Sequence, residues 1–232
     1  MTALRTSDYD VFSFDCYGTL VDWEKAIVEY LQSVLLAHDV HVFDGTILEF
    51  YAEWEPLEQR AGGSYRDVLT RVMGRYGSRL GFTATSEESD GFIQAIARAP
   101  AFEDTPEALT KLSDCGELAI ISNTDSDLIQ ETIEPLPVEF QTVVTAQDLG
   151  AYKPNLEMLK KAFDKISAGG KRILHVAESS FHDIAPASEL GFDTVWIQRS
   201  REHSSATQNV EIEPTWVFSS LAELVDSIES QA

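Results

Sequence analysis

The chain has 232 residues, 44% hydrophobic and 24% charged, a length and composition typical of a globular protein with a substantial core and not of a fibrous or disordered one. Its 17 Lys and Arg against 39 Asp and Glu give a formal net charge of −22, which argues against nucleic-acid and anionic-membrane binding. Because the apolar runs are far shorter than the roughly 20 residues of a membrane-spanning helix and the N-terminus lacks an apolar signal segment, we expect a cytoplasmic protein.

Short apolar runs predict the strands of a parallel sheet. Five runs are apolar at nearly every position, as in strands that helices cover on both faces, and a sixth is expected at an edge. His175 lies inside the fourth run and is predicted to be a packed, hydrogen-bonded histidine. In chain order the runs cover residues 11–14, 118–121, 142–144, 173–176, 194–197 and 216–218.

Helical periodicity separates these strands. The stretches 128–133, 156–166 and 184–190 place their apolar residues on one stripe, as amphipathic helices do. Two serines precede a last helix over residues 221–228, and the polar residues 199–210 are expected to form a loop. The alternation of strand and helix predicts an α/β fold with a doubly wound parallel sheet.

Residues 23–99 break this alternation. They contain helical patterns over 26–36, 47–57, 65–76 and 92–97 but no convincing strand. We therefore predict an all-helical domain, residues 21–99, inserted into an α/β domain formed by residues 1–20 and 100–232.

Polar side chains follow the strands of the predicted sheet. In open parallel sheets, ligands bind beyond the carboxyl ends of the strands. Each polar residue taken alone has an ordinary structural explanation as a turn residue or a helix cap, but caps do not explain a lysine and four strand ends together. The candidates are Asp15 and Thr19 after the first strand, Ser122 and Asn123 after the second, Lys153 near the third, and Glu178, Ser180 and Asp183 after the fourth.

The order and spacing of these residues resemble the four motifs of the haloacid dehalogenase superfamily of hydrolases. The resemblance extends over nearly the whole chain and implies a Rossmann-like core with the helical insert as a cap domain. Phosphatases of the superfamily carry a second aspartate two positions after the first; that position is Tyr17 here, a poor acid at neutral pH. The motif is similar instead to that of the type II 2-haloacid dehalogenases. The matching segments are Asp15-x-Tyr17-Gly18-Thr19-Leu20, Ser122-Asn123, Lys153-Pro154 and residues 178–183.

That resemblance implies a role for each motif residue. Asp15 would attack C2 of a small 2-substituted carboxylic acid, such as an (S)-2-haloacid, and water would hydrolyse the aspartyl ester. Thr19 would hydrogen-bond Asp15, and Lys153 would keep Asp15 ionised. Asp183 and Lys153 would orient the water. The resemblance further implies no cofactor and a homodimer formed through the cap. The substrate carboxylate would be bound by the backbone amides of Cys16 and Tyr17 and by Ser122, Asn123 and Ser180.

Three departures from the dehalogenase pattern concern the substrate. The cap segment that carries a halide-binding arginine in the dehalogenases has three carboxylates and no arginine over residues 47–55 here. Leu159 replaces an expected tyrosine, and Glu178-Ser179-Ser180 replaces Ser-Ser-Asn. Arg60 or Arg66 is the alternative cation. We expect a cap pocket, although a solvated helical face or a packed cap core explains the same residues; its members are Glu49, Phe50, Glu53 and Trp54.

Other functions remain open on the same residues. L-Azetidine-2-carboxylate hydrolase belongs to the same branch, and its amine leaving group would favour cap carboxylates such as Glu49, Glu53 or Glu55. A phosphatase would use Mg²⁺ bound by Asp15, Glu178 and Asp183. A non-catalytic protein on the same scaffold is the alternative from another functional class, and the presence of all the motif residues argues against it.

Overall fold

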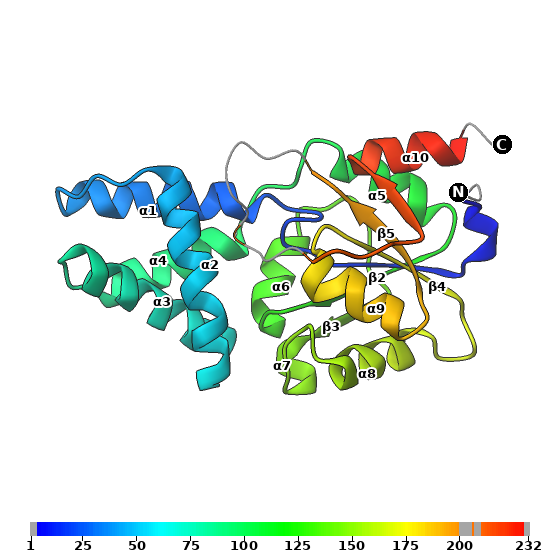
Figure 1. Cartoon of the computed structure of the whole chain (residues 1–232). Helices are drawn as coiled ribbons and strands as arrows, with labels where there is room; N and C mark the ends of the chain where they lie inside the picture. Colours follow the sequence, from blue (N-terminus) through cyan, green and yellow to red (C-terminus); the bar gives the residue numbers. More distant parts are fainter. Residues whose placement is uncertain (1–3, 200–205, 207–209, 230–232) are drawn as a thin grey trace.

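A sheet of six parallel strands forms the centre of the protein (Figure 1). The computed structural model describes residues 4–199, 206 and 210–229. The strand order is β3-β2-β1-β4-β5-β6, which confirms the predicted strands and the edge position of the last one. The strands are β1 (Val11–Phe14), β2 (Glu117–Ser122), β3 (Thr142–Thr145), β4 (Ile173–Ala177), β5 (Asp193–Ile197) and β6 (Trp216–Phe218).

Helices cover both faces of the sheet, because alternate strand residues project to opposite sides. Phe12 and Phe14 of β1 pack in one cluster with residues of α5 (Thr105–Ser113), α6 (Ser126–Ile133) and α10 (Leu221–Glu229). Val11 packs in the other cluster with residues of α8 (Leu156–Ile166) and α9 (Ala185–Glu189). The sheet domain also contains the helical segments η1 (Thr6–Asp8), α7 (Ala146–Leu149) and η2 (Ser180–Ile184).

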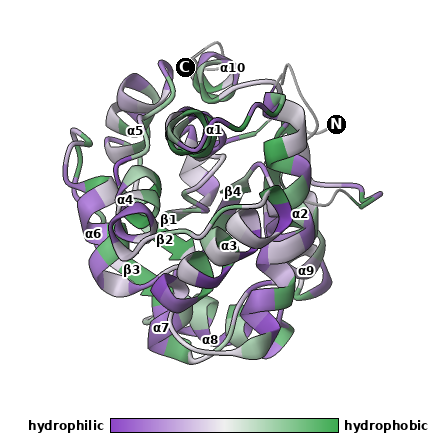
Figure 2. Ribbon diagram, turned by 90° about the vertical axis from the view of Figure 1, so that its left-hand side faces the viewer, coloured by the Kyte–Doolittle hydropathy of each residue, from purple (hydrophilic) through white to green (hydrophobic). Residues whose placement is uncertain are grey.

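Four helices between β1 and β2 form the predicted helical insert, which lies beside the sheet (Figure 1). Figure 2, seen from the side of the insert, shows hydrophobic strand residues near the centre and both hydrophilic and hydrophobic residues along the outer helices. The insert has no strand of its own within the described residues. Its helices are α1 (Trp23–Ala37), α2 (Asp44–Ala61), α3 (Tyr65–Leu80) and α4 (Ser86–Ala97).

Helices α4 and α5 differ from the prediction. Helix α4 begins at Ser86, six residues before the predicted start, because its first turn is polar and is stabilised by a capping box between Thr85 and Glu88. Helix α5 was not predicted, because it buries only a short apolar stripe that includes Leu109 and Leu112. Apolar periodicity detects neither a polar first turn nor a helix of nine residues.

The chain leaves and re-enters the sheet domain at one place. Val21 forms an antiparallel bridge with Ala101, and the Asp22 N–H donates to the carbonyl of Pro100 over 2.8 Å. We therefore propose the division into residues 1–20 with 100–232 and residues 21–99 as the domain organisation of the chain.

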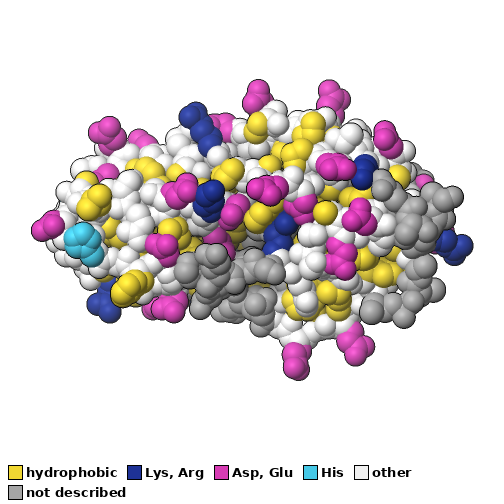
Figure 3. Space-filling model, turned by 90° about the horizontal axis from the view of Figure 1, so that it is seen from above, with side chains coloured by type: hydrophobic (Ala, Val, Ile, Leu, Met, Phe, Trp, Pro, Cys, Tyr) yellow, Lys and Arg dark blue, Asp and Glu magenta, His cyan; other side chains and the backbone are white. Residues whose placement is uncertain are grey.

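Acidic side chains are scattered over the surface, as Figure 3 shows for the upper face. None of the helices in the described part of the chain combines the length and the hydrophobicity needed to cross a membrane. Most of the predicted loop 199–210 lies outside the described residues, which include only residues 199, 206 and 210 of it.

Candidate active site

A cavity of about 370 Å³ lies where the carboxyl ends of the strands face the helical insert. The sheet domain and the insert both contribute to its walls. From the sheet domain come Asp15, Tyr17, Ser122, Asn123, Lys153 and Asp183, and from the insert come Trp23, Tyr51, Glu55, Gln59, Arg60 and Tyr65.

The Lys153 ammonium joins the two acidic residues of the cavity. Its Nζ lies 2.8 Å from Asp15 Oδ1, 2.8 Å from Asp183 Oδ1 and 2.9 Å from the carbonyl oxygen of Ile121. All three N–H bonds of the ammonium are therefore used. Lys153 is only 2% exposed, so this ion cluster is shielded from water and held in one geometry.

Strand β1 places Asp15 directly after its last residue, where the chain turns away from the sheet. The Thr19 hydroxyl donates to Asp15 Oδ2 over 2.8 Å and accepts the Glu178 N–H over 2.9 Å. Asp15 thus has one carboxylate oxygen bound by a hydroxyl and the other by the Lys153 ammonium.

Strand β4 supports Asp183 through His175. The His175 Nε2 lies 3.0 Å from Asp183 Oδ1, and its Nδ1 lies 2.9 Å from the Ser13 hydroxyl. Since the carboxylate can only accept, Nε2 carries the proton and Nδ1 accepts from Ser13. The buried, hydrogen-bonded histidine predicted from the sequence is confirmed, and it holds Asp183 Oδ1 in place. Asp183 Oδ2 has no hydrogen-bond partner among the described residues.

The charges of this cluster shift the pKa values of its members. Burial raises the pKa of Asp15, and the Lys153 charge opposes that rise. Burial acts on Asp183 in the same direction, but the Lys153 charge and the His175 hydrogen bond hold its pKa below the usual value. For Lys153, burial is outweighed by the attraction of the two carboxylates, which raises its pKa. The ammonium therefore stays charged, and Asp15 is a desolvated carboxylate with one shared counterion.

Strand β2 supplies Ser122 and Asn123 to the same edge. The Asn123 side chain accepts the Lys153 N–H over 2.6 Å and donates to the Lys153 carbonyl over 3.1 Å. Asn123 therefore fixes the backbone that carries the ammonium. The buried Ser122 hydroxyl lines the cavity and has no partner among the described residues.

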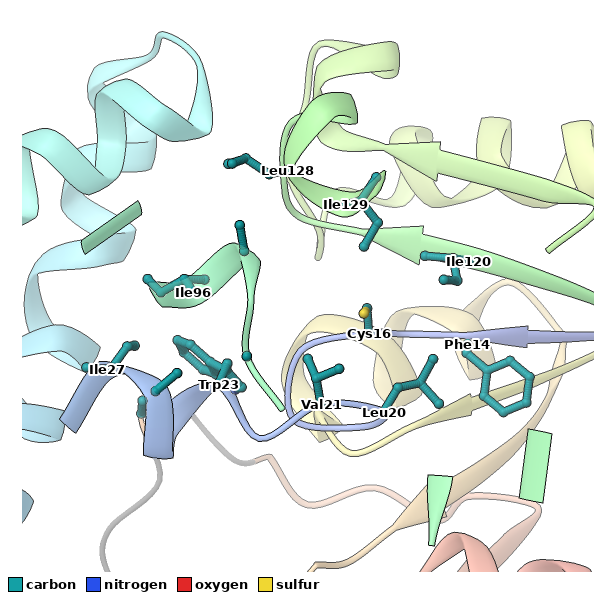
Figure 4. Close-up of a cluster of buried hydrophobic side chains, with 14 of the residues drawn as sticks. Phe14, Cys16, Leu20, Val21, Trp23, Ile27, Ile96, Ile120, Leu128 and Ile129 are labelled. Atoms are coloured by element: carbon teal, nitrogen blue, oxygen red, sulfur yellow. The ribbon is translucent and has the colours of Figure 1, made fainter. Parts of the chain in front are cut away.

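The side chains of two residues predicted to bind substrate lie elsewhere. The Ser180 hydroxyl accepts the Val210 N–H over 2.9 Å, and Ser179 lines the cavity in its place, because the chain after β4 turns into the π-helical segment η2. The Cys16 side chain is buried among Leu20, Val21 and Ile120, as Figure 4 shows. The prediction is wrong for the Ser180 side chain, whereas the prediction for Cys16 concerns its backbone amide and stays a prediction.

The predicted cap pocket is also wrong in its residues. Glu49 and Glu53 are exposed, while Phe50 and Trp54 stack with 4.7 Å between their ring centroids and pack on Tyr76. Helical periodicity turns the opposite face of α2 towards the sheet. The α2 residues that line the cavity are Tyr51, Ala52, Glu55, Pro56, Gln59 and Arg60.

Tyr17 lines the cavity, but its hydroxyl is bound away from Asp15. The hydroxyl lies 2.7 Å from Thr132 Oγ1 in α6, and burial raises the pKa of Tyr17 further above its ordinary value. A phenol in this position is not a proton donor for a leaving group at neutral pH.

A magnesium ion does not fit the donor set. Binding by Asp15, Glu178 and Asp183 requires their oxygens to converge on one point, and the Lys153 ammonium occupies the space between two of them. Within residues 4–199, 206 and 210–229, no group of three or more His, Cys, Asp and Glu side chains is arranged to hold a metal ion.

A carboxylate of the sheet domain holds the first turn of an insert helix. Asp125 Oδ1 accepts the N–H of Tyr65 over 2.9 Å, and Oδ2 accepts the N–H of Arg66 over 3.0 Å. These are free N–H groups at the start of α3. Arg66, one of the predicted cations, pairs with Asp127 instead of entering the cavity. Asp125 therefore fixes α3, and with it Tyr65, against the sheet domain.

Asp125→Ala is expected to lower the free energy of unfolding by about 1–2 kcal/mol, because two N–H groups of α3 lose their acceptor. Urea unfolding at pH 7 measures the change. The matched control is Asp127→Ala, which removes an exposed ion pair with Arg66 and is expected to cost less than about 1 kcal/mol. Equal losses in the two variants would contradict the role of Asp125.

Comparison with known proteins places this arrangement in a broader context. The family profile described as "Haloacid dehalogenase-like hydrolase" matches residues 11–197. The (S)-2-haloacid dehalogenase 4A of Burkholderia cepacia is 25% identical over 202 residues, which cover 80% of this chain and 81% of that protein. The glyceraldehyde 3-phosphate phosphatase of Methanocaldococcus jannaschii is 25% identical over 175 residues, 73% of each chain.

A solved structure has the same fold. The L-2-haloacid dehalogenase of Xanthobacter autotrophicus with chloropropionic acid covalently bound superposes with a TM-score of 0.77. The match covers 97% of this chain and the whole of that chain at 17% identity. The α/β sheet with a helical insert is therefore shared with a dehalogenase.

Proposed function

We propose that this chain, which belongs to the haloacid dehalogenase-like hydrolase family, hydrolyses a small 2-substituted carboxylic acid, namely an (S)-2-haloacid. The reaction proceeds through an ester on Asp15. One observation carries the proposal. Lys153 Nζ lies 2.8 Å from both Asp15 Oδ1 and Asp183 Oδ1 in the wall of the cavity. This geometry supplies a desolvated nucleophile, a fixed counterion and a second carboxylate for water.

In the first step, the Asp15 carboxylate attacks C2 of the substrate. A bond forms between the Asp15 oxygen and C2, the bond from C2 to the halogen breaks, and its electron pair leaves with the halide. Attack in line with the departing group inverts C2. The Ser122 hydroxyl, which has no partner among the described residues, is available to donate to the substrate carboxylate.

In the second step, water attacks the carboxyl carbon of the Asp15 ester. Asp183 Oδ2, which has no partner among the described residues, takes a proton from the water. The bond between that carbon and the product oxygen breaks, and the product oxygen takes up the proton. Asp15 returns to its carboxylate by losing a proton to solvent, so the sum is haloacid plus water giving hydroxy acid, halide and a proton.

Two features of the cavity bear on the leaving group. Arg60 lines it from α2 and provides a cation on the insert side. Tyr17, whose hydroxyl is bound to Thr132, is not placed to protonate an alkoxide. Opening of L-azetidine-2-carboxylate is the second candidate, because Glu55 lines the same cavity and would pair with the ring nitrogen.

Homodimer formation through the insert belongs to the same proposal; exposed Leu36 and Phe43 on the insert support it.

The first test measures products from (S)-2-chloropropionate with EDTA present. We expect one chloride and one (R)-2-hydroxypropionate per substrate consumed, because displacement inverts C2 and requires no metal ion. Parallel reactions contain L-azetidine-2-carboxylate, or p-nitrophenyl phosphate with Mg²⁺. If neither (S)-2-chloropropionate nor L-azetidine-2-carboxylate is consumed while p-nitrophenyl phosphate is hydrolysed, the proposal is wrong. If only the ring is opened, the chemistry at C2 stands and the leaving group is an amine.

A further inference from the structure

Glu55 is a cavity-lining carboxyl that the proposed reaction does not use. It lies on the face of α2 that is turned towards the sheet domain, together with Tyr51 and Gln59. It therefore faces the same space as Asp15 and Lys153 from the opposite side. An acid in the wall of a cavity that binds an anionic substrate requires an explanation, because its negative charge would weaken binding.

The hydrogen bonds of Glu55 come from neutral groups. The Gln59 side-chain amide donates to Glu55 Oε1, and the Tyr65 hydroxyl donates to the carboxyl group. Tyr65 lies 2.9 Å from the Tyr51 hydroxyl, and burial raises the pKa of both tyrosines well above their ordinary values. The tyrosines thus stay neutral at any pH at which the protein works. They orient the Glu55 carboxyl without neutralising it.

Burial raises the pKa of Glu55 to about 7, and the hydrogen bonds from Tyr65 and Gln59 limit the rise. Glu55 therefore changes its charge near neutral pH, in contrast to the carboxylates that share the Lys153 ammonium.

The other charged and titratable groups around the cavity do not cancel this change. On the sheet side, Asp15, Asp183 and Lys153 together carry one negative charge. Burial lowers the pKa of His182 to about 4, so it is neutral at pH 7, and burial raises the pKa of Tyr152 to about 12. The remaining groups are the Tyr17 phenol and the exposed Arg60 on α2.

We propose that Glu55 is a proton-gated catalytic residue: when protonated, it donates a hydrogen bond to the halide leaving C2, and when ionised, it repels the anionic substrate and the departing halide. The inference rests on the proposed function. The Asp15 oxygen bonds to C2, the halide leaves with the electron pair of the broken bond, and Glu55 keeps its proton within the hydrogen bond. The gating thus requires no additional reactant.

The test is the pH dependence of kcat/KM for (S)-2-chloropropionate between pH 5.5 and 9. For the wild type we expect a fall of about tenfold per pH unit above pH 7. Glu55→Gln keeps an N–H donor and cannot ionise, so its kcat/KM is expected to stay level over this range and to exceed the wild-type value at pH 9 by at least about tenfold. Glu53→Gln, on the exposed face of the same helix, is the matched control and should follow the wild-type profile.

Two results overturn the gate: a wild-type kcat/KM that is level or rises through pH 7, or a Glu55→Gln profile that falls as the wild type does. Absence of turnover in every variant contradicts the proposed function, and the gate is then tested by binding. Calorimetry follows 2-chloropropionate binding to Asp15→Asn and to the Asp15→Asn, Glu55→Gln double variant. A Kd that rises about tenfold per pH unit above pH 7 only in Asp15→Asn supports the gate. Kd values that change with pH in the same way in both variants overturn it.

Discussion

Asp15→Asn is expected to lower kcat for (S)-2-chloropropionate by on the order of 10⁴-fold or more, because the amide cannot form the ester. The asparagine side chain has nearly the same volume, and its amide oxygen can still accept a hydrogen bond from Lys153 Nζ. In the wild type, Nζ lies 2.8 Å from Asp15 Oδ1. Loss of activity therefore reports loss of the nucleophile. Chloride release, measured with an ion-selective electrode, gives the rate.

The control for this variant is Asp90→Asn, the same change on an exposed position of α4, which should leave kcat unchanged. A single turnover of the wild type in H₂¹⁸O provides the positive result. Because water attacks the carboxyl carbon, ¹⁸O should enter Asp15 first and reach the product only in later turnovers. Label in the product of the first turnover would mean that water attacks C2 directly and that Asp15 acts as a base.

Lys153→Met is expected to remove activity and to lower the free energy of unfolding at pH 7 by about 3–5 kcal/mol, because two buried carboxylates lose their shared counterion. Asp15 and Asp183 are 6% and 0% exposed, so water does not replace the ammonium. Urea unfolding at pH 7 and pH 5 measures the effect. Lys160→Met, which removes an exposed pair with Asp164, is the control and should change stability by less than about 1 kcal/mol.

The loss in Lys153→Met depends on pH in a defined direction. Burial raises the pKa of both carboxyl groups, and the ammonium opposes that effect. Without it, both pKa values in the folded state rise above those of the unfolded chain. A raised folded-state pKa means that protons bind on folding, so the variant gains stability as the pH falls. A deficit at pH 5 as large as at pH 7 would contradict this account.

Sequence patterns predicted the residues whose position is set by strand ends. Asp15 and Ser122 lie at one edge because parallel strands end at the same edge. Lys153 follows α7, and its Nζ lies 2.8 Å from both Asp15 Oδ1 and Asp183 Oδ1.

The insert side of the cavity was not predictable in the same way. Phe50 and Trp54 share a helix with Glu55, and sequence alone does not say which face of α2 meets the sheet domain. The four-residue spacing from Tyr51 to Glu55 indicates that both side chains lie on one face of the helix. It does not indicate that this face contacts the sheet domain. Ser180 was mispredicted because the chain enters a π-helical segment at this residue, where its hydroxyl accepts the Val210 N–H.

The bridge between Val21 and Ala101 allows the insert and the sheet domain to change independently during evolution. Because the chain departs and returns at adjacent positions, the helices between them can lengthen, shorten or be replaced without shifting the register of β1 against β2. The nucleophile and its ammonium would persist in such descendants, while the shape and polarity of the opposing wall diverge. A new insert must still match contacts such as those from Asp125 to α3 and from Thr132 to the carbonyl of Ala97. The residues that form the ester and the residues that face the leaving group are thus inherited as separable modules.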